Sequence, residues 1–120
     1  DRKGKPKKSI DPETDILIKS IVKNESSVTD EEIVERMMLP MIFECARCLE
    51  EKIVETPMEV DMGLLLGLGF PPFRTGALKY ADSIGLKNLV GLEAKYIGLG
   101  NMYKATEGMK VMATEGKTYY

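Results

Sequence analysis

The stretch from Asp61 to Leu78 constrains the fold more than any other part of the chain, because it is apolar and interrupted by many glycines and prolines. Gly69 suits the end of an apolar helix, since a residue without Cβ enters the left-handed conformation cheaply. Pro71 and Pro72 then prevent the helix from continuing. We therefore expect an apolar helix, a tight loop and the start of another helix.

Two further features of this stretch suggest packing. Gly63 and Gly67 lie one helical turn apart, so a partner element could approach the backbone closely there. Phe70 and Phe73 carry large apolar rings that a short loop would expose unless it folded back onto the core. We expect both rings to be packed.

The length and composition bound the size and class of the protein. A chain of 120 residues forms one domain with one core. Residues 1–10 hold five basic side chains against one acidic, so the remainder is more acidic than the net charge of −2. We expect a basic linker over 1–10 and a helical domain over 11–120. An acidic body also argues against nucleic acid as the partner.

The cellular location of the chain can be predicted from the kinds of segment that the sequence lacks. The run from Met62 to Phe73 is shorter than the ~20 residues that span a bilayer, so no transmembrane segment is expected. The chain begins at Asp1 without a signal peptide, which suggests a fragment or a processed product. Two cysteines and eight methionines fit a reducing compartment, and we expect a cytoplasmic protein.

Histidine is absent from the whole sequence. The commonest general base, the Ser-His and Cys-His pairs and the usual zinc and iron ligand sets are therefore excluded. We expect no catalytic residue, no metal site and no cofactor site in this chain.

Helix signals account for nearly all of residues 11–120, and no stretch shows sustained alternation of apolar and polar residues. Thr29 with Glu32, and Thr56 with Glu59, have the spacing of capping boxes, and Asp11 can cap a helix that starts at Pro12. The fold class is therefore all-α, a single domain of about six helices. The expected helices span 12–23, 30–51, 57–68, 76–84, 86–99 and 106–115.

The apolar residues predict which helical faces are buried. The second helix has a broad stripe in which Pro40 should cause a kink. The stripe contains Val34, Met37, Met38, Met41, Ile42, Cys45 and Leu49. The fifth helix should bury Leu89, Val90, Leu92 and Ile97. In the sixth, Met109 and Met112 should share the inward face.

Several patterns resemble reactive sites but have simpler explanations. Cys45-Ala-Arg-Cys48 lies far inside a predicted helix, where buried thiols behave as small apolar groups. Glu59 and Asp61 are two residues apart on a helix and point in different directions, so structural roles are expected. Arg74 could meet an anion or form a surface ion pair.

The glycine-rich stretch is not a nucleotide-binding loop. Gly67-Leu-Gly69-Phe-Pro-Pro lacks the G-x-G-x-x-G spacing and ends a helix instead of following a strand. A dinucleotide site is therefore excluded here.

Three segments carry a resemblance to a known family: Glu44-Cys-Ala-Arg-Cys-Leu-Glu-Glu, Ile53 to Gly63, and Gly67-Leu-Gly-Phe-Pro-Pro-Phe-Arg-Thr-Gly-Ala-Leu-Lys-Tyr-Ala-Asp-Ser-Ile-Gly85. The chain resembles the 3-hydroxyacyl-CoA dehydrogenase C-terminal domain, in the form found as the last domain of the bacterial multifunctional fatty-acid oxidation complex α subunit. The resemblance extends over nearly the whole chain.

This resemblance implies the second of two related helical domains in a longer chain. The parent would be an enoyl-CoA hydratase and NAD-dependent 3-hydroxyacyl-CoA dehydrogenase, with its catalytic groups in earlier domains. The implied partners are those preceding domains, a thiolase β subunit and the acyl-CoA substrate. The fragment itself should be inactive and should help to shape the acyl-CoA site.

One substrate-binding residue follows from the family pattern. The position of Leu66 is often tyrosine in similar proteins and contributes to the acyl-CoA region, whereas leucine offers only apolar contact. Thr75 stands where glycine is usual and should stiffen the loop. Two alternatives remain open: an independent interaction module that binds through Phe70 and Phe73, and self-association of the fragment.

Overall fold

The computed structural model describes residues 9, 11–22 and 27–120. Over these residues it is all-helical, without strands, as the sequence predicts. The α-helices are α1 Pro12–Ile21, α2 Asp30–Glu50, α3 Pro57–Gly63, α4 Ala77–Ile84, α5 Leu86–Tyr96 and α6 Glu107–Glu115. Shorter turns are η1 Leu64–Leu68, η2 Pro72–Arg74, η3 Ile97–Leu99 and η4 Asn101–Tyr103.

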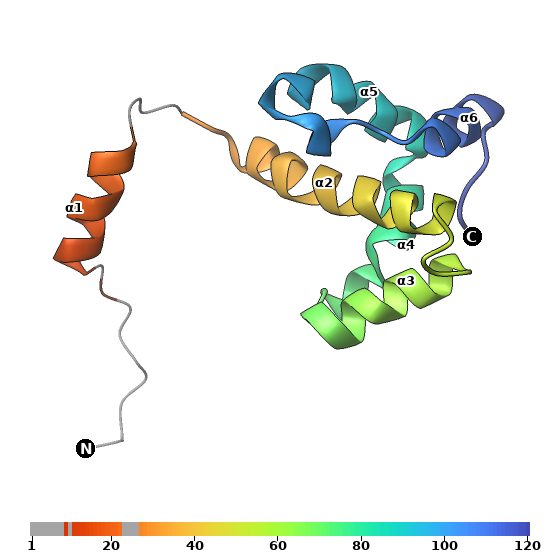
Figure 1. Cartoon of the computed structure of the whole chain (residues 1–120), viewed down its shortest axis with the longest axis horizontal. Helices are drawn as coiled ribbons and strands as arrows, with labels where there is room; N and C mark the ends of the chain where they lie inside the picture. The colour runs from red at the N-terminus through yellow and green to blue at the C-terminus, as the bar shows by residue number, and fades with distance from the viewer. Residues whose placement is uncertain (1–8, 10, 23–26) are drawn as a thin grey trace.

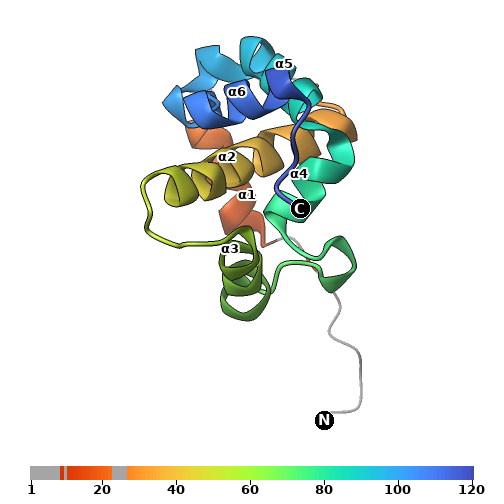
Figure 2. The same cartoon turned by 90° about the vertical axis from the view of Figure 1, so that its right-hand side faces the viewer.

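Helix α2 is the centre of the domain. Figures 1 and 2 show α5 and α6 on one side of α2 and α3 on the other, with α4 beside it. Helix α1 stands apart from them in Figure 1. The core is built on the C-terminal half of α2, where Leu39, Ile42 and Phe43 are almost fully buried. Leu78 of α4 and Met109 of α6 pack in the same cluster.

The predicted helix starts are confirmed. Thr29 with Glu32, and Thr56 with Glu59, form complete capping boxes, which satisfy backbone N–H groups that a helix leaves unpaired. Asp11 accepts a hydrogen bond from the backbone N–H of Glu13 (3.0 Å). These signals are local in sequence, so they need no tertiary contact to act.

The helix ends differ from the prediction in detail. The third helix changes to the wider π-helical turn η1 before Gly69 ends it at φ 68°. The fifth ends at Tyr96 and is followed by the 3-10 turns η3 and η4, of which η4 was not predicted. Proline 40 lies within the continuous helix α2.

Several burial predictions are wrong. Val34 and Met37 on the N-terminal half of α2 are exposed, whereas Ile42 and Cys45 further along the same stripe are buried. Ile97 is exposed because the backbone has already left α5 there. Met109 is buried and Met112 half-buried, as predicted.

Of the two aromatic rings in the loop after η1, only one is packed against the core. Phe70 is buried, whereas Phe73 is 81% exposed, so the prediction for Phe73 is wrong. The 3-10 turn η2 directs its ring away from the core, where the guanidinium of Arg74 lies 5.4 Å from the ring centroid.

Two sequence predictions fall mainly outside the described part of the chain. The basic linker lies on residues 1–10, of which the structure describes Ser9 alone, and the break after the first helix lies mostly on 23–26. None of the described helices combines the length and the apolarity that a membrane span requires.

Candidate functional site

Leu66, the one predicted substrate-binding residue, lies on the turn η1 with its side chain 80% exposed. It belongs to a line of apolar side chains four residues apart, Met58, Met62 and Leu66, which we call the outer stripe of α3. These residues are 64%, 45% and 80% exposed. Side chains at this spacing share one helical face. The outer stripe is therefore an apolar surface that the described residues leave open.

The opposite side of α3 is also apolar. Val60 is buried there, and Leu64 is half-buried against the core. A helix that is apolar on both sides is normally enclosed on both sides. This makes α3 with η1 the strongest candidate for an interaction surface.

A groove of about 640 Å³ lies between α2 and α3. Four sulfur-containing residues contribute to it, Met41, Cys45 and Cys48 from α2 and Met102 from η4, and we call it the sulfur-lined groove. Its remaining lining residues are Pro40, Glu44, Val54, Glu59, Val60, Gly63, Leu64 and Leu68.

The prediction of buried thiols is confirmed for Cys45 and only in part for Cys48. Both are free thiols on α2; Cys45 is buried and Cys48 half-buried. Burial raises the pKa of the Cys45 thiol to about 12, and the nearby Asp61 carboxylate adds to the shift. A thiol with so high a pKa forms little of the thiolate that reacts. Cys45 therefore lines the groove and does not act as a nucleophile.

Glu59 and Asp61 point in different directions, as expected, and each stabilises a helix start. Glu59 accepts hydrogen bonds from the backbone N–H groups of Glu55 (2.8 Å) and Thr56 (3.0 Å), which lower its pKa. The two groups do not form the carboxylate pair that acid–base catalysis uses.

Asp61 has a role that its sequence position does not reveal. Its carboxylate is buried and accepts hydrogen bonds from the backbone N–H groups of Leu78 (2.9 Å) and Lys79 (3.0 Å). It therefore caps α4, whose own N-cap residue, Gly76, has no side chain to do so. The hydroxyl of Tyr120 donates a third bond to Asp61 (2.9 Å), and burial raises the tyrosine pKa to about 12.

The guanidinium of Arg74 forms no ion pair with a carboxylate among the residues that the structure describes. Its guanidinium lies over the ring of Tyr80, 4.8 Å from the centroid, and near Phe73. A cation over an aromatic face is stabilised by the ring's electron density. The surface ion pair expected for Arg74 is therefore not formed among the described residues, and the guanidinium stacks on aromatic rings instead, while an anion-binding role stays a prediction.

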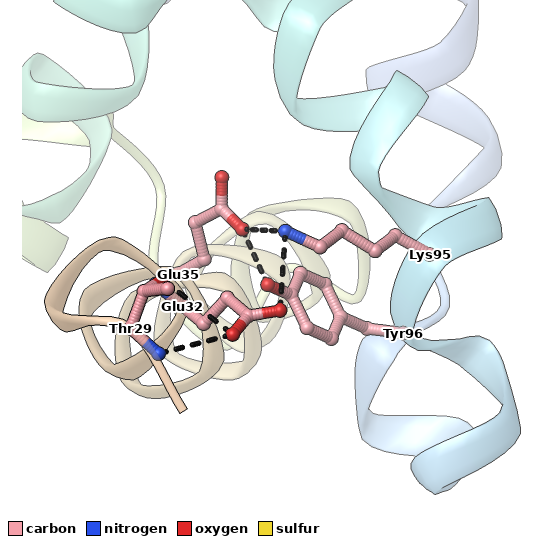
Figure 3. Close-up of polar contacts among 5 residues, drawn as sticks. All are labelled: Thr29, Glu32, Glu35, Lys95 and Tyr96. Carbon is pink, nitrogen blue, oxygen red and sulfur yellow. Dashed lines mark hydrogen bonds and ion pairs between the residues drawn. The ribbon is translucent and has the colours of Figure 1, made fainter. Parts of the chain in front are cut away.

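One polar cluster joins α2 to α5 and was not predicted (Figure 3). The carboxylate of Glu35 accepts hydrogen bonds from the amine of Lys95 (2.8 Å) and from the hydroxyl of Tyr96. Glu32 lies 3.8 Å from the same amine and also binds the backbone N–H of Thr29. The pKa of Glu35 is lowered, first by the Lys95 bond. The cluster holds two helices together, because one amine of α5 is shared by two carboxylates of α2.

The described residues offer no group of three or more acidic or cysteine side chains placed to hold a metal ion. The structure brings some of these residues together and not others. Both cysteines and Glu59 line the sulfur-lined groove, and Asp61 lies close enough to affect the Cys45 pKa. Leu66 lies apart from them on the outer stripe.

Comparison with known proteins agrees with this fold. The family model described as "3-hydroxyacyl-CoA dehydrogenase, C-terminal domain" matches residues 33–119. The chain is 50% identical over its whole length to proteins named "Fatty acid oxidation complex subunit alpha" from Pseudomonas paraeruginosa strain PA7 and Pseudomonas aeruginosa strain PAO1. It is 48% identical to the protein of that name from Pseudomonas savastanoi pv. phaseolicola. In each case it spans 17% of the relative's length. The chain belongs to the family of 3-hydroxyacyl-CoA dehydrogenase C-terminal domains.

Proposed function

We propose that this chain is a non-catalytic helical domain of a fatty-acid β-oxidation multienzyme. It packs on another helical domain of the parent chain and helps to shape the acyl-CoA site. The observation that carries the proposal is α3 with η1, which has an apolar inner side and the exposed outer stripe Met58, Met62 and Leu66. Burying such a stripe against a neighbouring domain is favourable because apolar area leaves water.

The chemistry available in the chain supports a scaffold role. Histidine is absent, the Cys45 thiol stays protonated and the capping carboxylates are already engaged. We assign the hydratase and NAD-dependent dehydrogenase activities to preceding domains of the parent, in a cytoplasmic complex with a thiolase β subunit. The relatives' printed name and their sixfold greater length support this assignment.

Binding of the 120-residue chain to the remainder of the parent tests the packing. We expect a complex whose affinity falls at least tenfold on Leu66→Lys or Met62→Lys. The matched control is Val111→Lys on α6, which changes an equally apolar exposed residue (56%) away from the outer stripe. An equal loss in the control, or no complex with the unchanged chain, would contradict the proposal.

The inactivity of the chain is tested separately by following NADH formation from a 3-hydroxyacyl-CoA. Turnover by the chain alone would show that it carries its own catalytic groups.

The alternative function, an independent protein-interaction module, would use the surface around Phe73, because the ring of Phe73 is exposed beside Arg74. Tight binding to an unrelated protein that Phe73→Ala abolishes, without binding to the parent, would favour an independent interaction module.

A further inference from the structure

We propose that α1 docks on the exposed N-terminal half of α2 of the same chain, as an antiparallel helix pair that the arrangement in Figure 1 leaves open. Helix α1 has no buried residue. A helix of 10 residues is marginal in water unless tertiary packing covers one of its faces. The proposal uses neither the outer stripe of α3 nor the activity of the parent.

One side of α1 is apolar and open to solvent. Leu17 and Ile21 lie four residues apart, with Ile18 beside them, so the three share one side of the helix. They are 60%, 68% and 51% exposed in that order. Asp15 and Lys19 form an ion pair with each other (2.9 Å) outside this apolar side. A helix with an apolar and a charged side packs through the apolar one.

The N-terminal half of α2 offers a matching surface. Ile33 and Met37 lie four residues apart and are 46% and 69% exposed. Together with Val28, Arg36 and Tyr103 they line a hollow of about 440 Å³, which we call the α2 hollow. Covering it with the apolar side of α1 would remove apolar area of both helices from water, which is favourable.

The lengths of the two helices and of their connection fit an antiparallel pair. Helix α1 has 10 residues, and α2 has as many from Asp30 to its first buried residue, Leu39. Residues 22–29 join the helices, a length found between antiparallel neighbours in bundles. A short tether gives a roughly millimolar effective concentration, so α1 should prefer its own α2 to that of a second copy in dilute solution.

Charge complementarity supports this orientation. Glu13 in the first turn of α1 and Arg36 at the α2 hollow form no ion pair among the described residues. If Ile21 lies opposite Asp30, Glu13 lies opposite Met38, because each is eight residues from that end. Arg36 is then within one helical turn of Glu13. The opposite charges attract each other there.

Hydrogen exchange of the whole chain, followed by mass spectrometry of the peptide over residues 12–21, measures docking. We expect Met37→Lys to speed exchange of this peptide at least about tenfold, because it places a charge in the α2 hollow. The matched control is Val111→Lys on α6, which changes an exposed apolar residue (56%) elsewhere and should leave the peptide unchanged. Exchange of the buried part of α2, residues 39–46, should stay slow in both variants and so report that the core is folded.

A charge exchange tests the orientation of the pair. Arg36→Glu should speed exchange of the α1 peptide about threefold, the effect of one surface ion pair. Adding Glu13→Arg should restore at least half of the loss. A cation in the first turn disfavours the helix by itself, so such rescue cannot come from a more stable α1.

Slow exchange of α1 that persists on dilution, is lost in Met37→Lys and kept in Val111→Lys, and is rescued by the charge exchange supports the proposal. Fast exchange in the unchanged chain, equal loss in the two lysine variants, or absence of rescue overturns it. Slow exchange that disappears on dilution also overturns it, since α1 would then be held by a second copy. The complex with the parent chain is tested by other variants, so either proposal can fail alone.

Discussion

The hydroxyl of Tyr103 donates a hydrogen bond to the backbone carbonyl of Arg36 (Oη···O 3.1 Å). That carbonyl is the one whose helical partner is missing, because Pro40, four residues on, has no N–H. A side chain from η4 thus replaces a backbone bond of α2, 67 residues away in the sequence. This explains how α2 can contain a proline near its middle without ending there.

Tyr103→Phe should destabilise the domain by about 1 kcal/mol, the usual net value of such a hydrogen bond. In a Pro40→Ala background the helix regains its own bond, so the cost should fall by at least half. Urea unfolding of the four proteins in this double-mutant cycle measures the difference. An equal cost in both backgrounds would show that Tyr103 does not compensate for the proline.

Gly76→Ala should destabilise the domain by about 3 kcal/mol, because the new methyl group would overlap a packed side chain. Its Cβ would lie 2.1 Å from Cγ of Asp61, the buried residue that caps α4. Gly91→Ala is the control, since a Cβ there meets no atom within 4 Å in the interior of α5. The control should gain up to about 1 kcal/mol of stability from helix propensity. Thermal unfolding should therefore shift in opposite directions for the two variants.

Thr75→Gly should stabilise the domain by about 1 kcal/mol. Thr75 has φ 68° and ψ −43°, and the N–H of Gly76 donates to the carbonyl of Arg74 across it (2.8 Å), which defines a tight three-residue turn. A β-branched residue is strained at this φ, whereas glycine is not. The threonine thus strains the turn, a stronger effect than the slight stiffening expected from the sequence.

Thr75→Ala serves as the control for this prediction, because alanine keeps the Cβ. It should gain less than half as much stability as Thr75→Gly in chemical unfolding. Equal gains would show that the hydroxyl, and not the backbone conformation, is responsible.

The Glu35 cluster should make stability fall in acid. Hydrogen bonds from Lys95 and Tyr96 lower the pKa of Glu35 below its ordinary value of 4.5. A group with a lowered pKa in the folded state stabilises the fold above its unfolded pKa, and this contribution disappears as pH falls through the folded value. Glu35→Gln should therefore be less stable than the unchanged chain at pH 7 and should approach it towards pH 3. A stability difference that does not vary with pH would contradict this prediction.

The parts of the fold that could be predicted from the sequence are those whose cause is local. Thr29 and Thr56 begin helices through glutamates three residues on, and Gly69 ends one through its own backbone. The role of Asp61 could not be found in this way, because its donors lie 17 and 18 residues further along the chain. Its position near the start of α3 gave a plausible but different reason for an acidic residue.

The candidate surfaces also depend on residues that are distant in the sequence, so they could be predicted only in part. The spacing of Val34 and Met37 predicted an apolar face correctly, but periodicity does not say which part of a face its neighbours cover. Leu66 could be singled out only through the family resemblance. The sulfur-lined groove depends on Met102, which lies more than fifty residues from the cysteines and only reaches them through the turns after α5.

The rings of Tyr96 and Tyr103 lie 5.6 Å apart, tilted by 32°, and the chain contains no tryptophan. The tyrosine bands in the near-ultraviolet circular dichroism of this protein therefore come from five tyrosines, without an overlapping indole band. Because both rings pack beside α2, their signal would disappear when the segment after α5 detaches. The domain thus carries a built-in spectroscopic probe for that event, and no extrinsic label is needed to follow it.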